Sequence, residues 1–165
     1  DKEIKEIVDF INSHDSYYTT SSCAGRIIVI DLGPGKRKHN NKWLIASHQP
    51  VEFKDLNDKL SSIGKDVWFR QEPFIMHIVS RTLKDAKKIL QSAKKSGFKH
   101  SGILTLQKRI IVEVAGSNML ETPIARNGRL LCSRDYLKIV LKEANKKLRL
   151  NMKKIQKFER LLKDL

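Results

Sequence analysis

A run of small polar residues from Tyr17 to Arg26 has the greatest capacity for chemistry in this sequence. It reads Tyr-Tyr-Thr-Thr-Ser-Ser-Cys-Ala-Gly-Arg, and Asp15 lies two positions before it. Hydroxyl side chains offer hydrogen bonds to a carboxylate or a ribose, and glycine lets a ligand approach the backbone closely. The same composition also suits an edge strand that ends in a turn. The residues alone therefore allow either a ligand-binding strand or a structural one.

Two histidines are candidates for proton transfer, because an imidazole titrates near neutral pH. His48 follows a predicted strand that begins near Trp43, whereas His77 shares a strand face with Val79. A histidine on an apolar strand face is more often a hydrogen-bonded structural group, so His48 is the slightly better candidate. Segments 96–102 and 115–123 could bind a ligand or simply connect elements.

The spacing of apolar residues predicts the elements that position these groups. Ile4, Ile7, Val8 and Ile11 recur at helical spacing, which predicts a helix over 2–13. Further helices are predicted over 54–62, from Leu83 to a C-cap at Ser96-Gly97, and over 133–164 with Ser133 as N-cap and a bend at 149–151. Strands are predicted at 17–22, 26–31, 42–48, 66–71, 74–80, 102–106, 109–115 and 121–125.

The order of these elements suggests an internal repeat. A helix and a polar segment lead into Arg26-Ile-Ile-Val-Ile, and later into Arg109-Ile-Ile-Val-Glu-Val. We therefore expect an α/β (α+β), non-Rossmann fold in one domain, 1–165, with a possible duplication near 1–80 and 81–165. Two β3α2-like repeats would form a single curled, barrel-like sheet with helices outside and a long C-terminal helix, since closure removes exposed edges.

The segment Asp31-Leu-Gly-Pro-Gly35 resembles the glycine turn of a Rossmann methyltransferase. In that fold a helix must follow the glycines. Here Lys-Arg-Lys-His-Asn-Asn-Lys follows, which has no apolar period. A hairpin loop with a basic tip at Lys36, Arg37 and Lys38 is the better interpretation.

The composition points to a polyanionic partner. The formal net charge is +15, from 33 basic and 18 acidic residues, so ion pairing cannot absorb the excess. The C-terminal helix contributes Lys153 and Lys154, either as phosphate contacts or as a solvated face. No apolar run approaches the roughly 20 residues of a membrane helix. Cys23 and Cys132 form no C-x-x-C pair, so we expect no metal site and a cytoplasmic location.

Together these segments resemble the wybutosine-synthesizing protein 3 family, in particular its archaeal members. The matching residues span nearly the whole chain in order: Tyr17 to Arg26, Trp43, Ser47-His48, Glu72-Pro-Phe74, His77, Ser80-Arg81, Ser96-Gly-Phe98, Ser101-Gly-Ile103, Ser117, Glu121, Pro123 and Tyr136. This sequence departs from the family's pattern in the hairpin tip and in the basic C-terminal tail. These departures affect the expected RNA docking more than the expected chemistry.

The resemblance implies an S-adenosylmethionine-dependent enzyme that methylates ring nitrogen N4 of a tricyclic wyosine precursor next to the anticodon of tRNA-Phe. A non-catalytic tRNA-binding module and a small-molecule methyltransferase are the alternatives. For the proton acceptor we favour His48 or His77, with Asp15 as the alternative. The cofactor pocket would be lined by Ser21, Ser22, Gly25, Ser101 and Ser117.

The remaining roles concern anions and bases. Arg26 or Arg81 would pair with the cofactor carboxylate or a tRNA phosphate, and Trp43 or Phe74 would stack on the tricyclic base. Lys36, Arg37, Lys38, Lys153 and Lys154 would hold the RNA. We expect polar strand-end residues from both halves to meet in a single cleft, namely Ser22, His48, His77 and Ser117.

Overall fold

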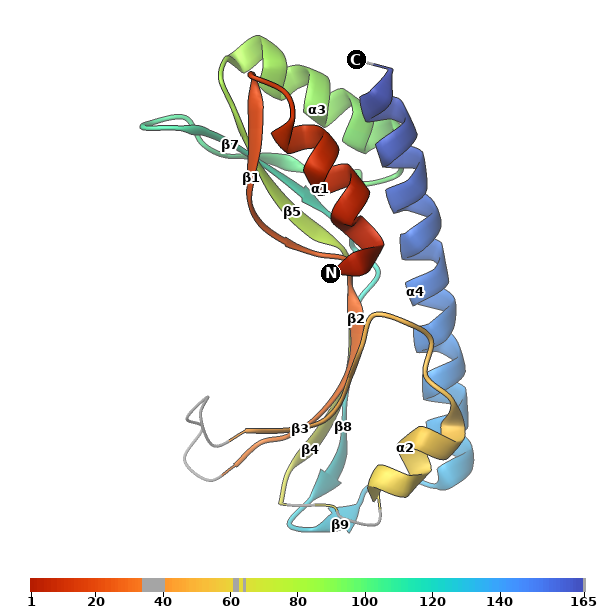
Figure 1. Cartoon of the computed structure of the whole chain (residues 1–165). Coiled ribbons are helices and arrows are strands. Elements are labelled where there is room, and N and C mark those ends of the chain that lie inside the picture. Colours follow the sequence, from red (N-terminus) through yellow and green to blue (C-terminus); the bar gives the residue numbers. More distant parts are fainter. Residues whose placement is uncertain (34–40, 61–62, 64, 165) are drawn as a thin grey trace. The chain divides into compact units, whose positions relative to one another are not determined.

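The structure of the chain is a computed structural model, which describes residues 1–33, 41–60, 63 and 65–164 (Figure 1). The chain forms two compact units. Unit 1 comprises Asp1–Gly25, Pro73–Asn118 and Leu150–Leu165, and unit 2 comprises Arg26–Glu72 and Met119–Arg149. Each unit draws on both halves of the sequence, so the units do not coincide with 1–80 and 81–165. The single domain with an internal duplication stays a prediction.

Unit 1 is a four-stranded antiparallel sheet with helices on one face. Its strands are β1 (Tyr17–Cys23), β5 (Ile75–Ser80), β7 (Ile110–Ala115) and β6 (Gly102–Thr105), in that spatial order. Its helices are η1 (Lys2–Ile4), α1 (Lys5–Asn12), α3 (Leu83–Lys95) and the end of α4 (Arg134–Lys163). One core joins them and includes Ile7, Met76, Ile89, Val112 and Phe158. We call the face of this sheet that carries His77 and Glu113 the open face of unit 1.

Unit 2 is a second, five-stranded antiparallel sheet. The order is β3 (Lys42–Ser47), β2 (Arg26–Asp31), β4 (Val67–Glu72), β8 (Leu120–Arg126) and β9 (Arg129–Leu130). Helix α2 (Phe53–Leu60) and the first half of α4 cover one face, with Val29, Phe69, Leu56 and Leu141 in the core. We call the face that carries Arg26 and Arg70 the open face of unit 2.

The expectation of one curled, barrel-like sheet is wrong. The described strands form two separate sheets, and neither is closed, because β1 and β6 are the edges of one and β3 and β9 the edges of the other. Each sheet instead buries one face under helices, which satisfies the apolar side chains without closure. The mixed α+β class, the non-Rossmann topology and the long C-terminal helix are confirmed.

The hairpin interpretation of the glycine turn is also confirmed. β2 pairs with β3 in antiparallel register, with Asp31 opposite Lys42, whereas a Rossmann crossover would make the two consecutive strands parallel. The basic tip that we predicted at Lys36, Arg37 and Lys38 lies outside the described residues.

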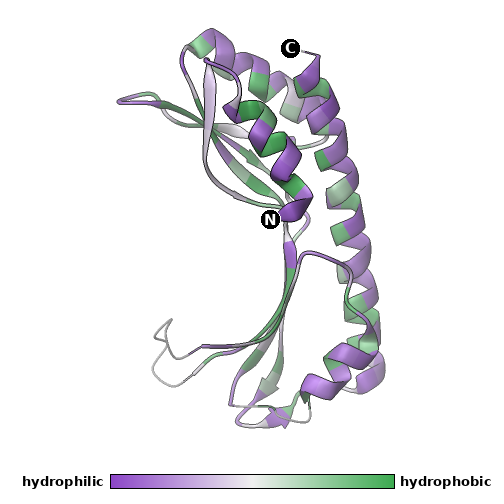
Figure 2. Cartoon of the chain, viewed as in Figure 1, coloured by the Kyte–Doolittle hydropathy of each residue, from purple (hydrophilic) through white to green (hydrophobic). Residues whose placement is uncertain are grey.

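Helix α4 contributes to the core of both units. Ser133 caps it, since its Oγ accepts from the backbone N–H of Tyr136 at 3.2 Å. Apolar residues recur along the helix in Figure 2, and residues 149–151, where we predicted a bend, are helical. No helix among the described residues is both long enough and apolar enough to cross a membrane.

One asparagine of α4 bridges backbone groups in each unit. In unit 2, Asn145 accepts from the N–H of Val51 at 3.0 Å and donates to its carbonyl at 2.9 Å. In unit 1, Asn151 accepts from the N–H of Phe74 at 3.0 Å and donates to the carbonyl of Ala24 at 2.6 Å. Asn151 is 2% exposed, whereas Asn145 is half-buried.

Candidate functional site

A line of three polar side chains crosses the open face of unit 1. Ser21 Oγ lies 2.9 Å from His77 Nδ1, and His77 Nε2 lies 3.0 Å from Glu113 Oε2. The strand register explains this line, since Ser21 is opposite His77 and His77 is opposite Glu113. Residues from three neighbouring strands thus form a continuous hydrogen-bonded chain.

A bulge in β1 places the serine in this line. The pairing with β5 runs Thr19 to Ile78 and then Ser21 to His77, so Thr20 is the extra residue. A bulge of this kind re-aims the side chains that follow it. Without it, Thr20 would lie opposite His77 and the serine would be displaced by one position.

The three groups define a direction for proton movement. An ionised Glu113 can only accept, so in the neutral imidazole Nε2 carries the proton and Nδ1 accepts from the Ser21 hydroxyl. The side chains of His77 and Glu113 are 27% and 30% exposed, so both remain accessible. The arrangement can take a proton from a ligand at Ser21 and hold the resulting positive charge on His77 beside the carboxylate.

Sequence reasoning found Ser21 and His77 but assigned them separate roles, and it missed Glu113. A signal was present, because Glu113 is the only charged residue in the strand Ile-Ile-Val-Glu-Val-Ala. A lone carboxylate in an apolar strand needs a partner. The partner could not be identified without the register of β5 against β7.

The two adjacent serines face opposite sides of β1. Ser21 pairs with His77 on the open face, whereas Ser22 pairs with Met76, a core residue. Ser22 therefore lies beside the start of α1, where it lines a hollow of about 330 Å³ with Asp1, Lys2, Ile4, Lys5 and Val8. Asp1 gives this hollow a carboxylate, and Lys2 and Lys5 give it ammonium groups. Ile4 and Val8 form an apolar wall. The hollow lies on the opposite side of β1 from Ser21 and His77.

Two other predicted residues are removed from ligand contact by burial. Phe74 is 0% exposed and packs against Phe98 with ring centroids 5.0 Å apart, so it cannot stack on a base. Ser101 is 6% exposed, donates to the carbonyl of Phe98 at 2.8 Å and accepts from Ala115 N–H at 3.3 Å. Its hydroxyl closes the turn before β6.

The remaining predicted residues of unit 1 are spread over its surface. Asp15 and Ser117 are exposed in loops, and Gly25 has a φ of 86° just after β1. Lys153 is exposed on α4, and the Lys154 side chain lies over Gly97. Arg81 is exposed at the end of β5. The structure brings none of these together with His77 through a hydrogen bond among the described residues.

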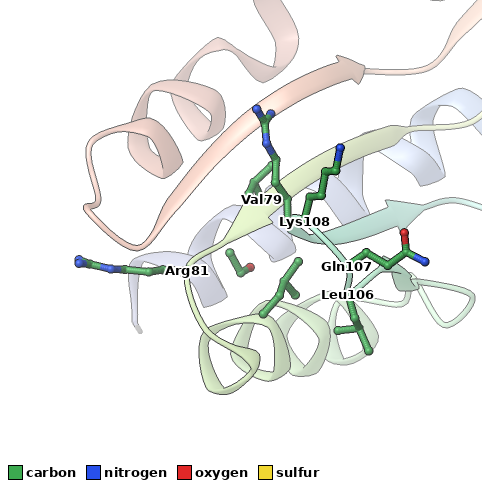
Figure 3. Close-up of a pocket in the computed structure, with 8 residues that line it drawn as sticks. Val79, Arg81, Leu106, Gln107 and Lys108 are labelled. Atoms are coloured by element: carbon green, nitrogen blue, oxygen red, sulfur yellow. The ribbon is translucent and has the colours of Figure 1, made fainter.

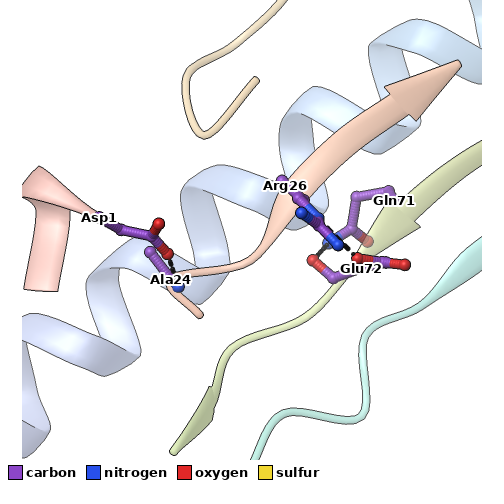
Figure 4. Close-up of polar contacts among 5 residues, drawn as sticks. All are labelled: Asp1, Ala24, Arg26, Gln71 and Glu72. Carbon is purple, nitrogen blue, oxygen red and sulfur yellow. Dashed lines mark hydrogen bonds and ion pairs between the residues drawn. The ribbon is translucent and has the colours of Figure 1, made fainter. Parts of the chain in front are cut away.

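Arginine, tryptophan and carboxylate side chains gather on the open face of unit 2. Arg26 Nε lies 2.8 Å from Glu72 Oε2, and the guanidinium carbon lies 5.1 Å from the centroid of the Trp43 ring. Figure 4 shows the pair of Arg26 with Glu72, beside Gln71, whose side-chain amide donates to the backbone carbonyl of Glu72 at 2.8 Å. The figure also shows Asp1 accepting from Ala24 N–H at 2.8 Å in unit 1.

The same pattern continues along this face. Arg70 pairs with Glu121 at 2.8 Å and Arg126 pairs with Asp66 at 3.0 Å. Their guanidinium carbons lie 5.9 and 5.5 Å from the centroid of the Trp68 ring. Trp43, at 49% exposed, is the aromatic ring of this face best placed to stack on a base.

The expected cleft takes its residues from both units. Ser22, His77 and Ser117 belong to unit 1, and His48 belongs to unit 2, where it is half-buried after β3. The cleft stays a prediction.

Of the two cysteines, Cys132 is a poor nucleophile, because burial raises the pKa of its thiol.

Comparison with known proteins gives a consistent result. The model of the family described as Methyltransferase TYW3 matches residues 1–164. A zebrafish protein named tRNA wybutosine-synthesizing protein 3 homolog (Danio rerio) is 38% identical over 166 residues, which covers 98% of this chain and 66% of that protein. The resemblance found from the motifs is thereby confirmed.

Archaeal proteins match over a larger share of their length. A Pyrococcus abyssi protein named tRNA(Phe) 7-((3-amino-3-carboxypropyl)-4-demethylwyosine(37)-N(4))-methyltransferase 2 is 34% identical over 166 residues, covering 100% of this chain and 81% of that protein. The solved structure of the PH1069 protein from Pyrococcus horikoshii has a TM-score of 0.89 and 31% identity, covering 97% of this chain and 84% of that one. The chain spans just under two thirds of the length of the zebrafish relative.

Proposed function

This chain belongs to the family of methyltransferase TYW3, and on that premise we propose that it methylates ring nitrogen N4 of a tricyclic wyosine precursor next to the anticodon of tRNA-Phe, with S-adenosylmethionine as the methyl donor. The name of the Pyrococcus abyssi relative supports this substrate. The net charge of +15 supports an RNA partner, because phosphate contacts dominate affinity for nucleic acid.

The observation that carries the proposal is the line of Ser21, His77 and Glu113. The acceptor nitrogen gains a methyl group and loses a proton, so the enzyme needs a group that takes this proton. The proton passes from nitrogen to Ser21 Oγ while the Ser21 hydroxyl proton passes to His77 Nδ1, 2.9 Å away. Glu113 then stabilises the imidazolium through Nε2 at 3.0 Å.

The cofactor supplies the methyl group from a sulfonium, which becomes a neutral thioether. It would have to approach from the open face of unit 1, beside Ser21, because its methyl group must reach the acceptor nitrogen and the hollow beside Ser22 lies on the opposite side of β1. Alignment and exclusion of water are then the main contributions of the protein. Trp43 in unit 2, with Arg26 held against its ring by Glu72, would stack on an unpaired base of the anticodon loop.

Incubation with isotope-labelled S-adenosylmethionine and tRNA from a strain that lacks this enzyme tests the proposal. Label should appear in tRNA-Phe, at the modified nucleoside next to the anticodon, after digestion and chromatography. Fully modified tRNA-Phe is the control and should take up no label. RNA binding without affinity for the cofactor by calorimetry would indicate a tRNA-binding module, and equal turnover of the free nucleoside would indicate a small-molecule methyltransferase.

A further inference from the structure

A basic hollow lies at one end of the sheet of unit 1, and Arg81, for which we predicted a cofactor carboxylate or a tRNA phosphate as partner, lines it. It lies between the end of β5 and the loop that joins β6 to β7, and its volume is about 410 Å³ (Figure 3). Arg81, Lys108 and Arg109 line it together with Ser80, Gln107 and Val79. A second hollow of about 340 Å³ also contains Gln107, Lys108 and Arg109. The loop residues thus contribute to two adjacent depressions.

Among the described residues, no carboxylate neutralises the three cations of this hollow. Arg81, Lys108 and Arg109 are exposed, and none forms an ion pair with a carboxylate of the described part of the chain. In Figure 3 the Arg81 and Lys108 side chains extend outward in different directions from the hollow. Three like charges around one depression produce a positive potential that attracts an anion.

Ser80 also lines the hollow, but its side chain lies on the other face of β5 from Val79. It is opposite Ile110, which packs against the helix-covered core, and its hydroxyl is buried. The three exposed cations therefore carry the attraction of this hollow for an anion.

The hollow and the line of Ser21, His77 and Glu113 share one strand. Val79, which lines the hollow, projects from the same face of β5 as His77. Arg81 follows His77 by four positions, roughly 13 Å along an extended strand. An RNA strand with one base at His77 would therefore carry its own backbone within reach of the hollow.

We propose that this hollow binds a backbone phosphate of the substrate RNA, close to the nucleoside that is methylated. The inference rests on the proposed function, because it takes the anticodon loop as the ligand. A phosphodiester presents two non-bridging oxygens that share one negative charge, which suit the guanidinium forks of Arg81 and Arg109 and the ammonium of Lys108. The site thereby positions the loop.

The test is a fluorescence titration of the tRNA-Phe anticodon stem-loop with the full chain at several salt concentrations. Each phosphate contact on a single strand contributes about 0.7 to the slope of log K against log salt concentration. The double substitution Lys108→Ala, Arg109→Ala should lower that slope by about 0.7, because both side chains contact the same phosphate.

The matched control is Lys94→Ala, Lys95→Ala, which removes two exposed charges from the end of α3, on the helical side of the same unit. Its slope should stay near that of the wild type. An equal fall in both double variants would overturn the proposal, since it would indicate only long-range attraction. A loss of S-adenosylmethionine affinity in the Lys108, Arg109 variant, with its RNA slope intact, would also overturn it. If the wild-type chain methylates the tRNA and the Lys108, Arg109 variant keeps the wild-type salt slope, only this phosphate site is refuted. If the wild-type chain does not methylate the tRNA, the proposed function is refuted.

Discussion

The two open faces use their charged residues in different ways. In unit 2, Arg26, Arg70 and Arg126 each pair with a carboxylate, at 2.8 to 3.0 Å. In unit 1, the cations at the end of the sheet have no such partner among the described residues, while the one carboxylate of the central line, Glu113, is paired with a histidine. The two sheets are built alike and differ mainly in how their charges are paired.

The net charge of a face differs from the charge that is available to bind a ligand, because paired side chains are already neutralised. Among the described residues, Arg81 and Arg109 of unit 1 have no carboxylate partner and can attract phosphate, whereas the three arginines named above in unit 2 are already paired. The paired arginines of unit 2 instead hold tryptophan rings, because a guanidinium stacks on an aromatic face while it binds a carboxylate edge-on. We therefore expect proton transfer and phosphate binding in unit 1, and base stacking in unit 2.

The largest expected effect comes from removing the imidazole of unit 1. His77→Ala should lower the single-turnover rate of methylation about 10²-fold to 10⁴-fold, the usual contribution of a general base. His100→Ala, an exposed histidine of the same unit, is the control and should be nearly neutral. His48→Ala probes unit 2 in the same assay. Full activity of the His77 variant, with a large loss in the His48 variant, would reverse our assignment.

The second effect compares the two asparagines of α4 by their contribution to stability. Asn151→Ala leaves the N–H of Phe74 and the carbonyl of Ala24 without partners in a buried site, at a cost of about 2 to 4 kcal/mol. Asn145→Ala should cost about 1 kcal/mol, because its site is half-buried and water can replace the amide. Urea unfolding of both variants measures the difference. Equal losses would show that burial does not set the cost.

The third effect tests whether Glu113 supports His77. Glu113→Gln replaces a carboxylate with an amide that stabilises the imidazolium less, so the methylation rate should fall roughly 10-fold to 100-fold, equivalent to about 1.5 to 3 kcal/mol. The cofactor dissociation constant should not change. Glu121→Gln makes the same change in unit 2, where it breaks a partly exposed ion pair with Arg70. A similar rate loss in both variants would argue against a special role for Glu113.

The smallest effect concerns base stacking in unit 2. Trp43→Ala should weaken binding of the anticodon stem-loop about fivefold, or about 1 kcal/mol, near the lower end for a stacked base. Trp43→Phe keeps an aromatic face and should recover most of that affinity. If alanine and phenylalanine at this position bind RNA equally well, the ring does not stack on the substrate.

The helices and most strands could be predicted from the sequence, because apolar periodicity and capping residues act locally. The sequence also singled out Trp43, Ser21 and His77, for which we propose roles in the sites. It missed β9, although Asn127-Gly128, with φ of 47° and 75°, is a strong hairpin signal.

Which side chains meet depends on the tertiary structure. The pairing of β5 with β7 joined Glu113 to His77, and one bulge in β1 turned Ser21 toward them while Ser22 faces α1. In the tertiary structure Phe74 is buried in the core, and two open sheets form where we expected a barrel. Strand register and sheet order depend on contacts between residues far apart in the chain, and shifting a strand by one residue exchanges its two faces.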